Sequence, residues 1–211
     1  MSDKKWVYLF GDGKAEGDAS LRELLGGKGA NLAEMTNLGV PVPPGFTITT
    51  EACHYFQDHG DIPPGLEEQV EEALKKVEGW MGTRYGDAAS PMLLSVRSGA
   101  PISMPGMMDT VLNLGLNEET VEGLAKTAGD ERFAFDCYRR FLQMYGDVVL
   151  GLKPEADEED PFEMLLAERK SKRGVESDVD LTAEDLKALA LAFREKIESH
   201  TRAPSVAAES P

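Results

Sequence analysis

The sequence has few of the residues that build disulfide frameworks, metal clusters and histidine-based active sites. Its 211 residues include two cysteines and three histidines. Cys53 and Cys137 lie far apart and form no C-x-x-C pair, which argues against a disulfide framework or a zinc cluster and predicts a reducing, cytoplasmic setting. Because His54, His59 and His200 lack a glycine-rich or hydroxyl-rich setting, we expect surface imidazoles and no nucleophilic catalysis by this chain.

Long apolar runs and positive charge are also scarce. No segment reaches the length of a membrane-spanning helix, and the N-terminus lacks a signal-peptide core. Lys and Arg number 22 against 38 Asp and Glu, so the formal net charge is -16. A surface of this charge repels nucleic acid and anionic lipid, and we expect neither as a partner. Hydrophobic residues make up 41% of the chain, which allows a sizeable core in one large domain or two small ones.

One stretch, residues 96–110, places an arginine, two glycines and two prolines directly after the apolar run 92–96. We expect a buried strand that delivers Arg97 into a loop. The planar guanidinium suits oxyanions such as phosphate, and glycine lets a backbone approach a ligand where a Cβ would collide. The stretch therefore predicts a polyphosphate site, with candidate residues Arg97, Ser98, Gly99 and Asp109.

A second stretch, residues 24–35, surrounds Lys28 with Gly26, Gly27 and Gly29 just before a helical pattern. The free amides of a helix N-terminus, the positive end of the helix dipole and an ammonium all favour an anion in the same volume. The spacing is not that of Walker A, because no hydroxyl follows the lysine. On these residues alone, a plain turn with a solvated lysine is an equal alternative.

Together the two stretches resemble the N-terminal, ATP-binding portion of the pyruvate, phosphate dikinase family. The similarity covers residues 6–8, 26–35, 42–50, 96–113 and 132–145. Beyond them it extends weakly to about Ile197. Phosphoenolpyruvate synthase, a sister family, continues its Val-Arg-Ser with Ser-Ala and acidic residues. This chain has Gly99-Ala100 and a Met-Pro-Gly-Met-Met-Asp-Thr run at 104–110, which favours the dikinase.

The resemblance implies an ATP-grasp-like domain that binds ATP with magnesium and phosphorylates a histidine on a separate domain. A barrel domain then transfers the group to pyruvate. The overall reaction interconverts ATP, phosphate and pyruvate with AMP, diphosphate and phosphoenolpyruvate. Residue by residue, Lys28 and Arg97 match the positions that contact the phosphates of the nucleotide.

The same resemblance implies that other parts of the enzyme lie beyond this sequence. These are the remaining ATP and magnesium ligands, the phosphohistidine domain and the pyruvate barrel, and the full-length enzyme is expected to be a homodimer. We therefore expect no catalytic residue and no metal ligand in this chain, which acts as an N-terminal nucleotide-binding fragment and does not complete the reaction alone. The alternatives are a non-catalytic nucleotide-binding or interaction remnant, or a phosphoenolpyruvate synthase relative.

The expected fold class is α+β, an incomplete ATP-grasp-like domain with a helical subdomain. Residues 1–113 form the α/β part, 114–200 the helical subdomain and 201–211 a disordered tail. Expected strands cover 6–10, 46–49 and 93–96, residues 11–13 form a turn, and a packing helix covers 66–81. Four polar residues predict later helix starts: Asn117, Asp130, Asp160 and Thr182, the last paired with Asp185.

The helix that begins after Asp130 raises two further points. An apolar stripe on it predicts a core-facing surface formed by Phe133, Cys137, Phe141, Met144 and Val148. The pair Arg139-Arg140 has two interpretations, a contact to phosphate or to a partner, and a salt bridge to the abundant carboxylates. The salt bridge is favoured because acidic side chains are so numerous.

Overall fold

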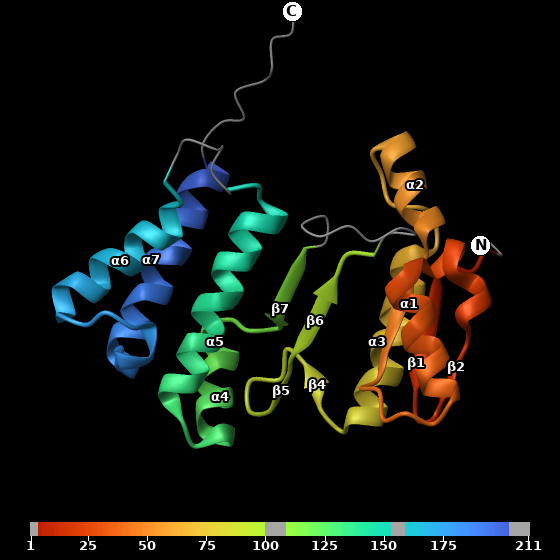
Figure 1. The fold of residues 1–211 in the computed structure, drawn as a ribbon, viewed down its shortest axis with the longest axis horizontal. Coiled ribbons are helices and arrows are strands. Elements are labelled where there is room, and N and C mark those ends of the chain that lie inside the picture. Colours follow the sequence, from red (N-terminus) through yellow and green to blue (C-terminus); the bar gives the residue numbers. More distant parts are fainter. Residues whose placement is uncertain (1–3, 100–108, 153–158, 203–211) are drawn as a thin grey trace, which may run out of the picture. The chain divides into compact units, whose positions relative to one another are not determined.

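The computed structural model describes residues 4–99, 109–152 and 159–202 (Figure 1). Helices and small sheets make the chain an α+β protein, as the sequence predicts. It folds into two compact units, each assembled from two stretches of sequence. The first contains Met1–Tyr85 and Arg97–Asp109, and the second contains Gly86–Val96 and Thr110–Pro211. The domain division expected at residues 113 and 200 stays a prediction.

The first unit is built on a three-stranded antiparallel sheet. Its central strand, β1 (Val7–Gly11), pairs with β2 (Lys14–Ala15) on one side and with β3 (Gly45–Ile48) on the other. The turn predicted after the first strand is present. Asp12 and Gly13 have φ angles of 50° and 73°, a left-handed conformation in which glycine carries no steric penalty.

Three helices pack with this sheet. They are α1 (Arg22–Asn37), which follows a 3-10 turn at Ala19–Leu21, α2 (Thr50–His59) and α3 (Leu66–Met81), and the short strand β4 (Arg84–Tyr85) comes after them. Both α1 and α3 contact β1 and β3. The bounds of α3 match the predicted helix, and its buried side chains Leu66, Ala73 and Val77 lie on the predicted face.

Helix α1 is interrupted at Gly26, whose φ of 68° and ψ of 168° are not helical. Glycine tolerates this backbone conformation, which costs any residue with a Cβ. The helix resumes directly afterwards, so Lys28 lies in the first turn of the resumed helix. Gly29 faces β3, where a Cβ would lie 2.6 Å from Cγ2 of Thr47. Close packing of helix on strand therefore requires glycine at this position.

The second unit is mainly helical. In chain order it contains β5 (Pro91–Met92), β6 (Leu94–Arg97), β7 (Thr110–Leu114), α4 (Glu118–Ala128), α5 (Glu131–Met144), a π-helical turn (Tyr145–Val149), α6 (Pro161–Arg173), a 3-10 turn (Asp178–Asp180) and α7 (Ala183–Arg202). The last residue of β6, Arg97, belongs to the first unit. Strands β6 and β7 pair with each other, and α5 packs against α4, α7 and β7.

Two contacts show how closely this unit is packed. Phe162 of α6 and Phe193 of α7 are fully buried and meet edge to face, with ring centroids 4.9 Å apart. A Cβ on Gly123 of α4 would lie 2.0 Å from the carbonyl oxygen of Ala88. The segment 86–96 is thus held against α4, although more than twenty residues separate Ala88 from that helix in sequence.

The helix starts predicted from polar residues are confirmed. Asn117 forms a capping box with Thr120 at the start of α4, and the side chains of Asp130 and Asp160 cap α5 and α6. Before α7, the carboxylate of Asp185 accepts hydrogen bonds from the backbone N–H and the hydroxyl of Thr182. Each cap satisfies amides that an isolated helix end leaves unpaired.

The apolar stripe predicted on α5 is confirmed in part, because Phe141 lies in the core and Cys137 and Met144 pack against it half-buried. Phe133 and Val148 are 48% and 38% exposed, and of the five predicted residues only Phe141 is buried. The buried face consists of Ala134, Phe135, Tyr138, Arg139, Phe141 and Leu142. The sequence carries two apolar stripes one residue apart, about 100° around the helix. The stripe that includes Tyr138 faces the neighbouring elements, and periodicity alone could not distinguish the two.

The salt-bridge interpretation of Arg139-Arg140 is confirmed. Arg139 is 3% exposed, and its Nη2 lies 2.8 Å from Oδ1 of Asp136 and 3.8 Å from Oδ2 of Asp178. Arg140 is exposed and places Nε 2.9 Å from Oδ2 of Asp136. Asp136 therefore bridges both arginines, which explains how a guanidinium can be buried in the second unit.

The end of the chain also differs slightly from expectation. Helix α7 continues through Thr201 and Arg202, two residues that we assigned to the tail, because the helical hydrogen bonds extend past His200. The rest of the predicted tail, 203–211, lies outside the described residues.

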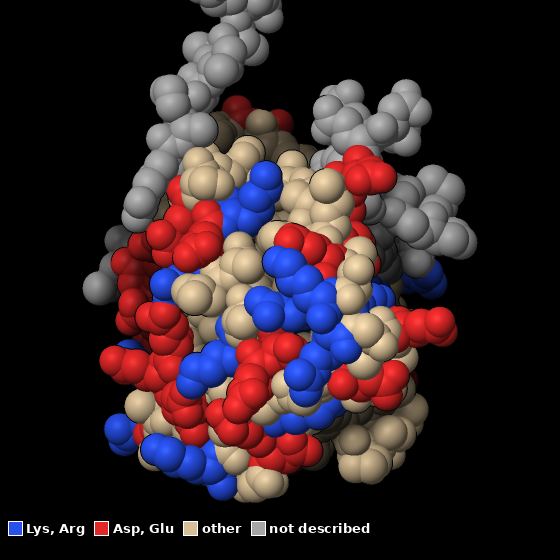
Figure 2. Space-filling model, turned by 90° about the vertical axis from the view of Figure 1, so that its left-hand side faces the viewer, with Lys and Arg blue, Asp and Glu red and all other residues tan. Residues whose placement is uncertain are grey.

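On the face that carries α6, acidic side chains do not form a uniform patch. Figure 2, which looks onto the α6 side of Figure 1, shows basic and acidic side chains interspersed. Ion pairs that involve α6 contribute to this pattern, since Lys172 lies 2.6 Å from Glu168 and Lys170 lies 3.0 Å from Asp178 of the following 3-10 turn. Paired charges of this kind favour solubility and offer no uniform surface to a charged partner.

Candidate functional site

The two stretches singled out in the sequence meet in the first unit. Nζ of Lys28 donates a hydrogen bond to the carbonyl oxygen of Ser98 at 3.2 Å, although 70 residues separate them. The break at Gly26 places Lys28 in the first turn of the resumed helix. The ammonium therefore lies against the peptide that directly follows Arg97.

Ser98 is itself fixed by Asp109, eleven residues later. The backbone N–H of Ser98 donates to the carbonyl oxygen of Asp109 at 3.0 Å. In return, the N–H of Asp109 donates to the Oγ of Ser98 at 2.9 Å, and that hydroxyl lies 3.3 Å from the carbonyl oxygen of Asp109. The two residues form a closed, reciprocal set of hydrogen bonds that we call the Ser98–Asp109 clamp.

Arg97 ends β6 and is exposed, next in sequence to the clamp. Its neighbour Ser98 accepts the hydrogen bond from Lys28, so the ammonium lies beside the backbone that carries Arg97. An ammonium and a guanidinium in one small region can bind a polyanion by charge-assisted hydrogen bonds.

The candidate glycines differ in what surrounds them. Gly26 is buried and holds the left-handed break in α1, and Gly27 is half-buried beside it. Gly29 is buried against Thr47, so close packing accounts for its identity. Gly99 is exposed and would have nothing within 4 Å of an added Cβ. A ligand contact from Gly26, Gly27, Gly29 or Gly99 stays a prediction.

Comparison with known proteins identifies the relatives of this chain. Residues 22–78 match the family model described as "Pyruvate phosphate dikinase, AMP/ATP-binding domain". The chain is 54% identical over 195 residues to the pyruvate, phosphate dikinase of Rhizobium meliloti, covering 92% of the chain and 21% of that protein. It is 55% identical over 193 residues to pyruvate, phosphate dikinase 1, chloroplastic, of Oryza sativa subsp. japonica, covering 91% and 20%. The chain belongs to the pyruvate, phosphate dikinase family.

A third relative extends the range of organisms. The pyruvate, phosphate dikinase of Clostridium symbiosum is 53% identical over 191 residues, covering 90% of the chain and 21% of that protein. The chain spans about a fifth of the length of the relatives it matches. This match to the dikinases resolves the alternative of a phosphoenolpyruvate synthase relative in favour of the family predicted from the Gly99-Ala100 segment.

The three histidines of this chain lie on the surface. His54, His59 and His200 are exposed, as expected, and His59 stacks on Tyr55 with ring centroids 4.1 Å apart. In the described residues, no three His, Cys, Asp or Glu side chains form a group that could hold a metal ion.

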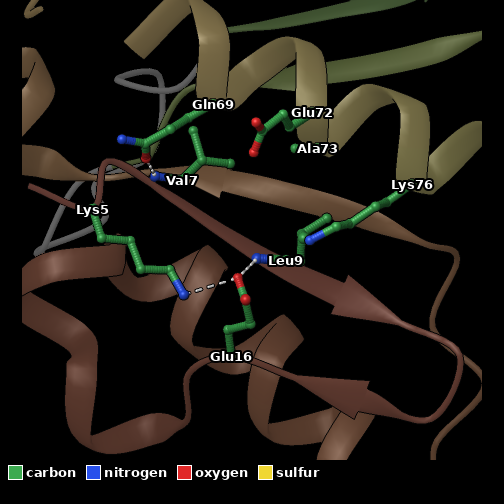
Figure 3. A pocket seen from close by; sticks show the side chains of 8 residues that line it. All are labelled: Lys5, Val7, Leu9, Glu16, Gln69, Glu72, Ala73 and Lys76. Atoms are coloured by element: carbon green, nitrogen blue, oxygen red, sulfur yellow. Dashed lines mark hydrogen bonds and ion pairs between the residues drawn. The ribbon is translucent and has the colours of Figure 1, made fainter. Parts of the chain in front are cut away.

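A shallow pocket of about 150 Å³ lies between β1 and α3, where neither Lys28 nor Arg97 reaches (Figure 3). Its lining carries both charges: Lys5, Val7, Leu9, Glu16, Gln69, Glu72, Ala73 and Lys76. Oε2 of Glu16 accepts a hydrogen bond from the N–H of Leu9 at 2.8 Å and lies 3.1 Å from Nζ of Lys5. The two carboxylates offset the two lysines, so this pocket is a poor phosphate site.

The charges around Glu16 also change its acidity. Partial burial raises the pKa of the carboxyl, but the hydrogen bond from Leu9 and the nearby charges of Lys5 and Lys76 outweigh burial and lower it overall. The resulting carboxylate is held in the ionised state by structural partners. Glu16 is accordingly a structural residue of the sheet.

The two cysteines are free thiols in different surroundings. Cys53 is exposed on α2, whereas Cys137 on α5 is partly buried. Burial raises the pKa of the Cys137 thiol, Asp136 raises it further, and Arg140 partly offsets both.

The part of the chain that the structure describes contains no helix long and apolar enough to cross a membrane.

The sequence named the clamp residues without revealing their pairing. The sequence predicts Ser98 and Asp109 as candidate residues of the site loop, but local spacing does not indicate the partner of either. Thr47, which closes over Gly29, carried no signal that could have singled it out. These are tertiary contacts, so a single sequence gives no direct indication of them.

Proposed function

We propose that this chain binds the phosphates of ATP through Lys28 and Arg97, as the nucleotide-binding portion of a pyruvate, phosphate dikinase. The contact that carries the proposal is the hydrogen bond from Lys28 to Ser98, which puts the lysine beside the residue that follows Arg97. The name of the matching family model, an AMP/ATP-binding domain, supports the same ligand.

The two cations supply complementary chemistry. The ammonium of Lys28 has three donors, of which one goes to Ser98 and two can donate to phosphate oxygens. The guanidinium of Arg97 can donate two parallel hydrogen bonds to a single phosphate. Amides of the helix that resumes after Gly26 add a favourable dipole. Together they can oppose the repulsion between a chain of net charge -16 and a polyanion.

The wider reaction belongs to the same proposal. We infer that the full enzyme interconverts ATP, phosphate and pyruvate with AMP, diphosphate and phosphoenolpyruvate through a phosphohistidine on another domain. Magnesium bound to ATP neutralises part of the phosphate charge, while Lys28 and Arg97 bind and orient the chain of phosphates. An ATP-grasp-like fold, a homodimeric enzyme and a cytoplasmic location are parts of this proposal, the last supported by the two free thiols.

Titration with magnesium-ATP tests the phosphate roles. Charge-assisted hydrogen bonds are worth about 1.5–3 kcal/mol each. Lys28→Ala and Arg97→Ala should therefore each weaken binding by roughly ten- to a hundredfold. Arg97→Lys keeps the charge and loses the fork, so it should recover only part of the affinity.

The titration can be followed by NMR, and another lysine of the first unit provides the control. Chemical-shift titration by NMR is suited to an affinity that is about millimolar in the unmutated chain. Lys14→Ala removes an exposed lysine of β2 and changes the net charge by the same amount as Lys28→Ala. Unchanged affinity in folded Lys28→Ala and Arg97→Ala proteins would leave both as ordinary surface residues and refute the proposal.

A further inference from the structure

Ser98 is an exposed residue whose hydrogen-bonding groups are all engaged. Its N–H donates to Asp109, its hydroxyl accepts from the N–H of Asp109, and its carbonyl oxygen accepts from Lys28. An exposed serine ordinarily exchanges such bonds with water at little cost. Here they connect two stretches of the chain, one containing Lys28 and one containing Arg97.

We propose that the Ser98–Asp109 clamp positions the two phosphate-binding cations, holding the Ser98 carbonyl where it orients Lys28 and fixing the end of the strand that carries Arg97. This inference rests on the proposed function, because it names what sets the geometry of that same site. Ser98 is a positioning residue that acts through Lys28 and Arg97.

The chemistry of lysine explains why the site needs such a device. The four-carbon stem of Lys28 has many rotamers, and a phosphate that captures a free side chain must pay for its ordering. The hydrogen bond to Ser98 already restricts the ammonium before ligand binds. The carbonyl of Ser98 can do this only if Ser98 is itself held in place. The backbone N–H and the side-chain hydroxyl of Ser98 both bond to Asp109 and hold it there.

The position of Arg97 depends on the same clamp through covalent geometry. Consecutive Cα atoms are about 3.80 Å apart across a trans peptide. Fixing Ser98 therefore restricts the position of the Cα atom from which the Arg97 side chain extends. The clamp therefore restricts the starting points of both cations before a ligand binds. Preorganisation of this kind improves affinity without adding a contact.

The test compares Ser98→Ala with Ser98→Thr. Alanine removes the hydroxyl and keeps the backbone bonds possible, whereas threonine restores an acceptor for the N–H of Asp109. Ser90→Ala is the matched control, since the hydrogen bond from Ser90 to Asp87 uses a backbone N–H that alanine retains. The probe is inorganic triphosphate with magnesium, titrated into the full chain and followed by NMR. Amide hydrogen exchange of Asp109 reports the clamp independently of any ligand.

We expect Ser98→Ala to expose the Asp109 amide to faster exchange and to weaken triphosphate binding by roughly three- to tenfold, the range for ordering one long side chain. Ser98→Thr should restore both properties, and Ser90→Ala should change neither. In a Lys28→Ala background, Ser98→Ala should cause a smaller further loss than in the unmutated chain, because its effect passes partly through the lysine. A purely structural role would give the same loss in both backgrounds.

The outcomes separate this inference from the function beneath it. Fast Asp109 exchange with unchanged triphosphate affinity in Ser98→Ala would overturn the positioning role while leaving the phosphate site intact. Equal losses in the two backgrounds would overturn it as well. The proposed function fails if the unmutated chain does not bind triphosphate, or if the Lys28→Ala and Arg97→Ala variants bind it as tightly as the unmutated chain. The positioning role then fails with it.

Discussion

Replacement of Gly29 by alanine tests whether the glycine-rich stretch is built for packing as well as for ligand. The new Cβ would lie 2.6 Å from Cγ2 and 2.9 Å from Oγ1 of Thr47, and 3.3 Å from Cβ of Leu25. Real Cβ atoms do not approach other atoms at the first of these distances, so α1 must move away from β3 or Thr47 must change rotamer.

Two opposing terms set the magnitude. Glycine to alanine inside a helix stabilises by about 0.5–1 kcal/mol in the absence of a clash. Overpacking a filled interface costs typically 1–3 kcal/mol. Because the contact at Gly29 involves two atoms of a β-branched side chain, the clash should win. We expect a net loss of about 1–2 kcal/mol, which corresponds to a fall in Tm of roughly 2–8 °C in a chain of this size.

Urea unfolding of four proteins measures the effect. They are the unmutated chain, Gly29→Ala, Thr47→Ala and the double variant. Thr47→Ala removes both atoms that clash, so the double variant should recover at least about 1 kcal/mol relative to the sum of the single changes. Gly79→Ala is the control, since this exposed glycine of α3 would have nothing within 4 Å of its new Cβ. It should stabilise by about 0.5 kcal/mol.

Two results would refute the packing argument. One is a Gly29→Ala protein as stable as Gly79→Ala, which would mean that the contact with Thr47 relaxes at no cost. The other is a loss of stability in Gly29→Ala that Thr47→Ala leaves unchanged, which would place the strain elsewhere.

Two further predictions concern the second unit and the thiols. Hydrogen bonds from Thr182 lower the pKa of Asp185 below its ordinary 3.8, so its ionised form stabilises the fold above pH 3.8 and that contribution fades as pH falls further. Asp185→Asn should cost about 1 kcal/mol at pH 7 in urea unfolding, with the gap closing as the pH falls below 3.8. A gap independent of pH would contradict this. Iodoacetamide at pH 8 should alkylate the exposed Cys53 much faster than Cys137, because the pKa of the Cys137 thiol is raised. Peptide mass mapping would measure the two rates, and equal rates would show that α5 opens.

The helix starts were predictable because their chemistry is local. A side-chain oxygen at Asn117, Asp130 or Asp160 satisfies amides two or three residues away, so the sequence contains both partners. The same holds for the pairing of Thr182 with Asp185. Strands β1, β3 and β6 match their predicted bounds to within a residue at either end, since apolar runs bounded by turns are also local signals. The expectation that β6 is buried is wrong, because three of its four residues are exposed.

Elements that depend on distant partners were not predictable in this way. The short strands β2, β4 and β5 have two residues each and exist only because another strand lies beside them. Which face of α5 is buried depends on the elements that pack against it, and the periodicity of the helix does not predict those elements. At the candidate site, family resemblance grouped Lys28 with Arg97, but only the fold reveals that Ser98 connects them.

The two interleaved units constrain how this protein can be made on the ribosome. Residues 1–85 emerge first, yet they wait for residues 97–109 to complete the first unit. In between, residues 86–96 emerge with no partner until the helices after residue 110 are synthesised. Lys28 similarly leaves the ribosome long before the carbonyl that it binds, 70 residues later. The first unit cannot be completed before part of the second has been synthesised, so a nascent chain stalled near residue 95 would contain both units unfinished.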